Sequence, residues 1–207
     1  MKLRIHRFLP TTTVEGPGVR ACIWVQGCPI HCKGCAVPWT WSPNHGQEVE
    51  VEQLARQILE EPEIEGVTFV GGEPFEQAEA LSSLGKILKS KGLSVVTFSG
   101  YEYKHLQSSQ RQDWQDLLTV TDLLIDGPFK QELLDLARPW VGSSNQQYRF
   151  LTDRYKYLEN QLQQIPNKIE VRLNPDGQIE INGMASQQML HQLFEEEFYQ
   201  KRSQMNK

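Results

Sequence analysis

Residues 66–74 read Gly66-Val67-Thr68-Phe69-Val70-Gly71-Gly72-Glu73-Pro74, a β-rich run that ends in two glycines, a glutamate and a proline. A short apolar run bounded by glycine is typical of a buried strand. On both sides the apolar residues change to helical spacing. Residues 50–61 place Val51, Leu54, Ala55, Ile58 and Leu59 on one face before Pro62, and Leu81, Leu84, Ile87 and Leu88 mark a second helix that stops before Gly92. The stretch therefore predicts a helix, a strand and another helix in succession.

The alternation extends in both directions along the chain. Further strands are expected at residues 3–8, 19–26, 93–98, 123–125 and 148–151, and helices around 114–118 and near 130–137. Strands that alternate with helices are typical of parallel sheets with right-handed crossover connections. We therefore predict an α/β fold.

The last part of the sequence has a different pattern. It predicts a helix near residues 153–163, strands at 168–173 and 178–181 around the turn Asn174-Pro175-Asp176-Gly177, and an amphipathic helix from Ser186 to about Tyr199. We expect one domain over residues 1–207, with a core at about 5–150 and a C-terminal helix and hairpin extension at 151–200.

Composition limits the classes of protein to consider. The 207 residues are 39% hydrophobic and carry a net charge of −5, which suits one ordinary core and argues against a nucleic-acid partner. No apolar run approaches the roughly 20 residues that a membrane span needs, and the N-terminus lacks the apolar region of a signal peptide. We expect a cytoplasmic protein without a membrane partner.

Three of the four cysteines, Cys28, Cys32 and Cys35, form a CxxxCxxC loop directly after a predicted strand. Three thiolates suit an iron–sulfur cubane, since its fourth iron is then free to bind a substrate. A Cys3His zinc site with His31 or His45 and a disulfide framework are the competing interpretations. Cys22 is more typical of a buried strand residue than of a ligand.

The unusual residues follow the ends of predicted parallel strands, where ligands collect in α/β folds. They are the cysteine loop, Gly71-Gly72-Glu73-Pro74, Ser99-Gly100-Tyr101 and Asp126-Gly127-Pro128-Phe129. We expect all four to share one rim.

Several segments, taken in order, resemble a known family. They are Gly16-Pro17-Gly18-Val19-Arg20, Gln26-Gly27-Cys28-Pro29, the CxxxCxxC loop, Pro38-Trp39-Thr40-Trp41, Gly71-Gly72-Glu73-Pro74, Ser99-Gly100-Tyr101, Ile125-Asp126-Gly127-Pro128-Phe129 and Gly142-Ser143-Ser144-Asn145-Gln146. With these the chain resembles the radical S-adenosylmethionine (radical SAM) superfamily over about residues 5–150. Within it, the likeness is to the activating enzymes of anaerobic ribonucleotide reductase and, more distantly, of pyruvate formate-lyase. The fold that this implies is a single-domain, incomplete TIM-like barrel of parallel strands.

The resemblance also implies the cofactors and their residues. It implies that Cys28, Cys32 and Cys35 hold a [4Fe–4S] cluster whose fourth iron is chelated by the amino and carboxylate groups of SAM, and that the backbone of Gly71, Gly72, Glu73 and Pro74 receives the SAM amino group. Glycines permit close approach of a backbone, and Glu73 can accept from an ammonium. Ser99 is a further cofactor-binding candidate. Asp126 is either a partner for ribose hydroxyls or a plain turn residue.

The implied reaction needs no catalytic side chain beyond the cluster and SAM. An electron from a flavodoxin or ferredoxin cleaves SAM to methionine and a 5′-deoxyadenosyl radical, which takes a hydrogen atom from a glycine of a glycyl radical enzyme. Ser143, Ser144 and Asn145 are candidates to hydrogen-bond the entering backbone, and Arg20 to meet an acidic group in the site or to form a surface ion pair.

Two features bear on the identity of the partner. The family commonly has His-Asn or Tyr-Asn after the third cysteine and an Arg after Ser-Ser-Asn-Gln, whereas this chain has Ala36-Val37 and Gln147. Two alternatives therefore stay open: a radical SAM enzyme that acts directly on a peptide or small molecule, and a non-catalytic zinc or iron–sulfur binding module.

Overall fold

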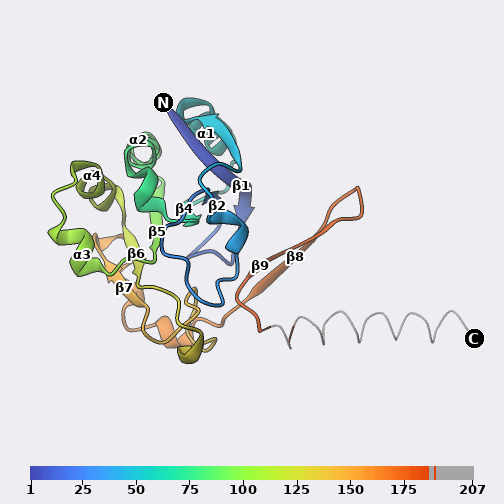
Figure 1. Cartoon of the computed structure of the whole chain (residues 1–207). Helices are drawn as coiled ribbons and strands as arrows, with labels where there is room; N and C mark the ends of the chain where they lie inside the picture. The colour runs from blue at the N-terminus through green and yellow to red at the C-terminus, as the bar shows by residue number, and fades with distance from the viewer. Residues whose placement is uncertain (187–188, 190–207) are drawn as a thin grey trace, which may run out of the picture.

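The computed structural model describes residues 1–186 and 189, and in it a seven-stranded sheet runs in the order β3-β1-β2-β4-β5-β6-β7 (Figure 1). The strands are β1 Lys2–Thr12, β2 Arg20–Val25, β3 Gln47–Glu50, β4 Gly66–Gly71, β5 Ser94–Ser99, β6 Leu123–Asp126 and β7 Gln147–Phe150, with a separate hairpin of β8 Ile169–Leu173 and β9 Ile179–Gly183. The helices are α1 Val51–Leu59, α2 Ala78–Lys89, α3 Tyr103–Ser108 and α4 Gln112–Val120.

The centre of the sheet is parallel, so the predicted α/β class is confirmed. β2, β4, β5 and β6 pair in parallel, while β1, β3 and β7 are antiparallel to their neighbours. Val25 pairs with Gly71, and Ser99 pairs with Asp126. The carboxyl ends of the four parallel strands therefore lie at one edge of the sheet.

The two faces of the sheet are covered differently. On one face of the sheet, strand residues such as Ile23 of β2 and Phe69 of β4 pack against the buried sides of α1, α2 and α4. On the opposite face, Val96 and Ile125 pack against Trp140 and Tyr155, which lie in segments without α-helix. Alternate side chains point to opposite faces of a strand, so each buried strand contributes to both layers.

Two predicted helices are wrong. Residues 130–137 form a single 3₁₀ turn at Gln131–Leu133, because the backbone bonds across a loop: Asp135 N–H donates to Gly142 O at 3.0 Å and Ser144 N–H to Leu133 O at 2.8 Å. Residues 153–163 form 3₁₀ turns at Asp153–Leu158 and Leu162–Gln164, in which the buried side chains are three residues apart. A spacing of three suits a 3₁₀ helix.

The remaining predicted strands and helices were confirmed in part. Residues 148–151 were expected to continue the parallel pattern, and this prediction is wrong. The described residues 127–146 contain no α-helix that could form a crossover between β6 and β7, and β7 pairs antiparallel to β6. The hairpin at 168–181 is confirmed. β3 and α3 were not predicted, and most of the helix expected over 186–199 lies outside the described residues.

Within the described part of the chain, no helix combines the length and apolar character that a bilayer crossing needs.

Candidate functional site

The cysteine loop leaves the end of β2 and is fastened by backbone bonds. Gly27 N–H donates to Thr40 O at 2.7 Å and Cys28 N–H to Trp41 O at 3.0 Å. The Gln26 amide donates to the carbonyls of residues 39 and 42, at 3.0 and 2.7 Å. Residues 26–28 are thus tied to residues 39–42 at the far end of the loop.

The thiols of Cys28, Cys32 and Cys35 are free and partly buried, and burial raises the pKa of the first two. Cys22 is fully buried against Leu9 and Trp24, as expected of a strand residue, and burial raises its pKa well above the usual value. No group of three or more His, Cys, Asp or Glu side chains in residues 1–186 is placed to hold one metal ion. In a cubane each thiolate binds a separate iron, so the three thiols need not meet at one metal ion.

Trp41 lines the same loop. Its ring stacks on that of His31, with the centroids 4.6 Å apart, and its Nε1–H is buried without a hydrogen-bond partner in the described residues. A buried donor is costly unless something accepts from it. Hydrogen bonds to the sulfurs of a cluster are a known use for such a donor. The residues present therefore fit an iron–sulfur group.

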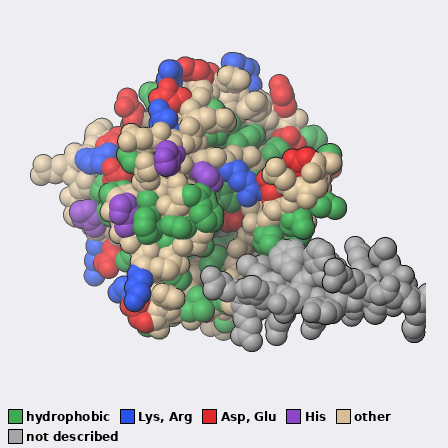
Figure 2. Space-filling view, turned by 45° about the vertical axis from the view of Figure 1, so that its right-hand side comes forward, with side chains coloured by type: hydrophobic (Ala, Val, Ile, Leu, Met, Phe, Trp, Pro, Cys, Tyr) green, Lys and Arg blue, Asp and Glu red, His purple; other side chains and the backbone are tan. Residues whose placement is uncertain are grey.

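A groove of about 400 Å³ runs beside this loop, lined by His31, His45, Trp39 and Trp41 with neighbouring prolines. The His6 ring lies 6.3 Å from that of Trp39, which is 56% exposed. Figure 2 shows histidine side chains gathered around an apolar patch. The cysteine loop is therefore flanked by an aromatic surface that solvent reaches.

The turn Gly71-Gly72-Glu73-Pro74 lies against the start of the cysteine loop. Gly72 N–H donates to Val25 O at 2.9 Å and Glu73 N–H to Gly27 O at 2.8 Å. A Cβ on Gly72 would lie 2.3 Å from the Gly27 oxygen, and one on Gly71 2.6 Å from the Trp24 Cα. Both glycines are thus needed for close approach to this chain's own backbone.

The Glu73 carboxylate is fully buried and accepts three hydrogen bonds from the chain. The donors are Phe75 N–H at 3.1 Å, the Ser99 hydroxyl at 2.9 Å and Gly100 N–H at 2.8 Å. Burial nevertheless raises the pKa of Glu73 to about 7. The side chains of Glu73 and Ser99 thus join the ends of β4 and β5.

Asp126 ends β6 and is also engaged by the chain. Its Oδ1 accepts from Arg149 Nε at 2.8 Å and its Oδ2 from Tyr103 N–H at 2.7 Å. Asn145 lies on the connection to β7: its amide donates to Pro128 O at 2.8 Å, and its Oδ1 is buried with no partner among the described residues. Sequence reasoning did not find Arg149, because only the antiparallel return of β7 brings it opposite β6.

Arg20 is not where it was expected. It starts β2, at the opposite edge from the cysteines, and is fully buried, so both the site contact and the surface ion pair are wrong. Its guanidinium donates to neutral groups, among them Thr68 Oγ1 at 2.9 Å, Val67 O at 2.7 Å and Tyr155 Oη at 2.6 Å. Among residues 1–186 it has no carboxylate within ion-pair distance. It joins β2 to the segment after β7.

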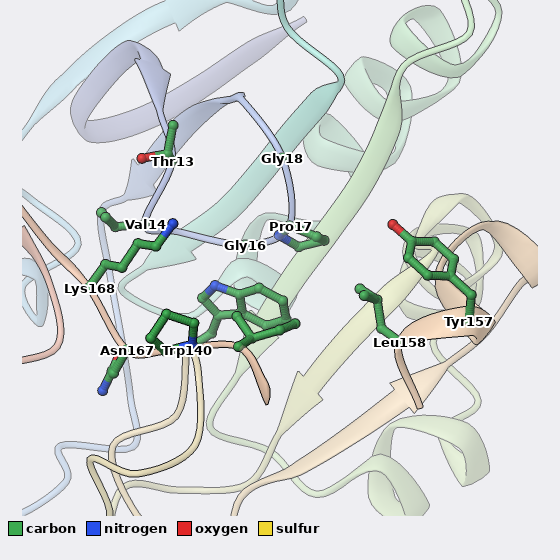
Figure 3. Close-up of a pocket in the computed structure, with 12 residues that line it drawn as sticks. Thr13, Val14, Gly16, Pro17, Gly18, Trp140, Tyr157, Leu158, Asn167 and Lys168 are labelled. Atoms are coloured by element: carbon green, nitrogen blue, oxygen red, sulfur yellow. The ribbon is translucent and has the colours of Figure 1, made fainter. Parts of the chain in front are cut away.

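A cavity of about 210 Å³ opens at this amino edge, between Gly16-Pro17-Gly18, Trp140 and residues 157–158 and 165–168 (Figure 3). It contains none of the predicted site residues. The chemistry-bearing residues and this cavity therefore belong to opposite edges of the sheet.

Comparison with known proteins agrees with the geometry of the carboxyl edge. A family described as a 4Fe-4S single cluster domain matches residues 14–149. The anaerobic ribonucleoside-triphosphate reductase-activating protein of Salmonella typhi is 32% identical over 152 residues, which cover 70% of this chain and 96% of the relative. The chain belongs to the radical SAM family of activating proteins. Its cofactors are a [4Fe–4S] cluster and SAM.

Other members show the breadth of this family. The protein of the same description from Vibrio cholerae is 34% identical over 152 residues, covering 70% of this chain and 96% of the relative. The pyruvate formate-lyase-activating enzyme of Clostridium pasteurianum is 33% identical over 128 residues, covering 59% and 50%. The crystal structure of QueE from Escherichia coli aligns with a TM-score of 0.41 and 22% identity over 48% of this chain and 53% of that one, which is too distant to bear on the fold.

Proposed function

We propose that this radical SAM protein activates a glycyl radical enzyme, namely an anaerobic ribonucleotide reductase of the same cell or a relative of it. The names and extents of the related activating proteins support this, since the Salmonella and Vibrio relatives match along 96% of their own length. We further propose a cytoplasmic location and a single radical SAM domain over residues 1–207. We also propose that the fold is an incomplete TIM-like barrel, which the four adjacent parallel strands support.

One observation carries the proposal for the site: the backbones of the cysteine loop and the glycine-rich turn are bonded directly to each other. In the proposal, Cys28, Cys32 and Cys35 hold three irons of the cluster. The turn at Gly71–Pro74 then presents its backbone to the SAM amino group a short distance away. Groups fixed before binding cost less to order when the ligand arrives, which is why such rigid placement favours binding.

The carboxylates act through the backbone in this proposal. Glu73 fixes the glycine-rich turn, and its bonds to Ser99 and Gly100 also fix the end of β5. The ends of β4 and β5 are thereby held in a constant position relative to the cofactor. Asp126, oriented by Arg149, does the same for β6. When bound, the cluster and SAM supply the 5′-deoxyadenosyl radical, and the electron comes from a flavodoxin or ferredoxin.

The partner's glycine would meet the connection before β7. Ser143 is fully buried, with its hydroxyl accepting from Lys130 N–H at 3.1 Å, so an entering backbone does not reach it. Ser144 is exposed, and the Asn145 Oδ1 lacks a donor among the described residues. An unpaired acceptor suits the N–H of an entering backbone.

The experiment is an anaerobic activation assay. The reconstituted, reduced protein is incubated with SAM and the anaerobic ribonucleotide reductase from the same cell, and EPR follows the glycyl radical while chromatography follows 5′-deoxyadenosine. We expect a glycine radical with the reductase, and none with a reductase whose radical glycine is alanine. Asn145→Leu should suppress the radical while iron content stays normal. SAM cleavage with a peptide or small molecule, without a radical on the reductase, would refute the proposal.

A further inference from the structure

The groove beside the cysteine loop, called the aromatic groove below, is lined by His31, Trp39, Trp41 and His45 with neighbouring prolines. Trp39 is 56% exposed, although tryptophan is among the side chains that bury the most surface when they are covered. Exposed aromatic side chains around a groove mark a surface that another molecule covers. The groove is therefore a docking surface, and its surroundings indicate for which partner.

The walls of the aromatic groove are continuous with the cysteine loop. His31 lies between the first two cysteines of the CxxxCxxC loop, and its ring stacks on that of Trp41. Its φ of 51° is in the left-handed region, which few residues other than glycine adopt. At the other end of the loop, Cys35 Sγ accepts from Val37 N–H at 3.5 Å, two residues before Trp39. A redox group seated in the groove would thus lie beside the residues proposed to hold the cluster.

The stretch of chain that contains the cysteine loop is free of acids. Residues 16–47 include no aspartate or glutamate, although the whole chain has 26 of them and a net charge of −5. Lys33 lies in the loop, is exposed, and forms no ion pair with any described residue. An acidic protein is therefore attracted to this surface and repelled by the rest of the chain.

Two further cations lie next to the aromatic groove. The Arg4 guanidinium donates to the carbonyl of His45 at 3.4 Å. Arg4 and Lys2 both pair with the carboxylate of Glu48, at 2.7 and 3.1 Å. Beside His45, two positive charges thus share one negative charge. Complementary charge steers a partner to its site and fixes its orientation, so the groove suits a partner whose redox group is surrounded by acids.

The lining of the groove distinguishes between kinds of electron carrier. Planar rings stack on aromatic side chains with their centroids about 4.5–7 Å apart, and a flavin is a planar system of three fused rings. A volume of about 400 Å³ is in the range of pockets that hold such groups. An iron–sulfur carrier offers peptide around its cluster and no ring to stack. The groove also shares no residue with the connection before β7, to which the glycine of the partner enzyme is assigned above.

We propose that the aromatic groove is the docking surface for an acidic electron carrier of the flavodoxin type, with Trp39 against the flavin ring and Lys33 and Arg4 against the acidic rim. One electron leaves the reduced flavin and enters the cluster. The carrier is oxidised by one electron, the cluster is reduced by one, and no bond, proton or group is transferred. The inference rests on the proposed function, in which the cluster receives its electron from such a carrier.

The first test measures binding directly. The anaerobically reconstituted protein is titrated with a flavodoxin from the same cell in a calorimeter. Trp39→Glu removes the aromatic contact and adds an acid, so we expect the Kd to rise at least about tenfold. Tyr157→Glu is the matched control, because Tyr157 is an equally exposed aromatic at the opposite edge of the sheet, and its Kd should equal that of the wild type. Added salt should weaken binding of the wild type.

The second test separates this inference from the proposed function. Dithionite is a small reductant that needs no docking surface, so with it both variants should keep wild-type iron content and cleave SAM to 5′-deoxyadenosine at the wild-type rate. With reduced flavodoxin, cleavage in Trp39→Glu should be at least about tenfold slower. No cleavage by the wild type with dithionite would refute the proposed function, and the calorimetric Kd would still decide the role of the groove.

Three results would overturn the inference. The first is a wild-type Kd for flavodoxin in Trp39→Glu. The second is binding of a ferredoxin, and not of flavodoxin, that Trp39→Glu weakens, since the groove would then belong to an iron–sulfur carrier. The third is loss of the glycyl radical in Trp39→Glu when dithionite is the reductant, since the groove would then bind the reductase.

Discussion

Gly72→Ala tests how tightly the glycine-rich turn is held against the cysteine loop. The new Cβ would lie 2.3 Å from the Gly27 oxygen and 3.0 Å from the Val25 oxygen. These two oxygens accept the hydrogen bonds that join the segments, from Glu73 N–H and Gly72 N–H. Because the clash is with backbone, the two chains must separate and both bonds are lost. Leaving two backbone donors unpaired costs about 2 to 6 kcal/mol in total.

The assay is urea unfolding of the cluster-free protein, together with iron content after anaerobic reconstitution. We expect the free energy of unfolding to fall by that amount and the iron content to fall with it, because Cys28 follows Gly27 directly. Gly177→Ala is the control: Gly177 has a φ of +84° and nothing within 4 Å of its new Cβ, so it should cost only about 1 to 2 kcal/mol of left-handed backbone strain and leave iron unchanged. Wild-type stability and iron content in Gly72→Ala would refute the close packing of the two segments.

Four further results are expected. Cys28→Ala should abolish the cluster and SAM cleavage, whereas Cys22→Ala should keep both; iron and 5′-deoxyadenosine assays decide, and an intact cluster in the first variant would show a wrong ligand set. With the pKa of Glu73 raised to about 7, the folded protein binds a proton that the unfolded chain has lost, so the free energy of unfolding should fall by up to about 3 kcal/mol as pH rises from about 4.5 to 7. Glu73→Gln should remove that slope in urea titrations, and an unchanged slope would contradict the assignment. Trp41→Phe should keep the cluster but make its midpoint potential more negative in an EPR redox titration, since a donor to sulfur stabilises the reduced form; an unchanged potential would mean that the indole points elsewhere. Arg20→Ala should lower the free energy of unfolding by about 3 to 5 kcal/mol, because several buried acceptors lose their donor; a loss below about 1 kcal/mol in urea unfolding would contradict that network.

The sequence predicted best where structure depends on nearby residues. α1, β4, α2 and β5 all lie where periodicity and glycine or proline boundaries indicate them. The segment at 130–137 failed because Leu133, Leu134 and Leu136 repeat at a spacing that a helix would also have. Leu134 is 56% exposed, and its neighbours bond across the loop to residues 142–144. Competition from such distant partners is not visible in a local pattern.

The same distinction applies to the site. The predicted parallel strands implied that the strand ends lie at one edge of the sheet. They also implied that the cysteine loop and the glycine-rich turn lie close together. The hydrogen bonds of the side chains at this edge were not predicted from the sequence. Glu73 was expected to accept from a ligand, and its carboxylate is already filled by Ser99 and by two backbone donors. Hydrogen-bond partners that are 26 or more residues away require the folded chain.

The bond between Arg20 and Tyr155 spans 135 residues, and the bonds from Arg7 to the hairpin span more than 170. Strands β1 and β2 lie on either side of the first turn of the chain, and the cysteine loop follows β2 directly. During synthesis, which proceeds from the N-terminus at about 5 to 20 residues per second, these strands leave the ribosome before the residues that complete their contacts. The two strands that precede the cysteine loop are therefore among the first parts of the protein to be made, while the contacts of Arg20 and Arg7 form only after residues 155 and 180–182 have been made.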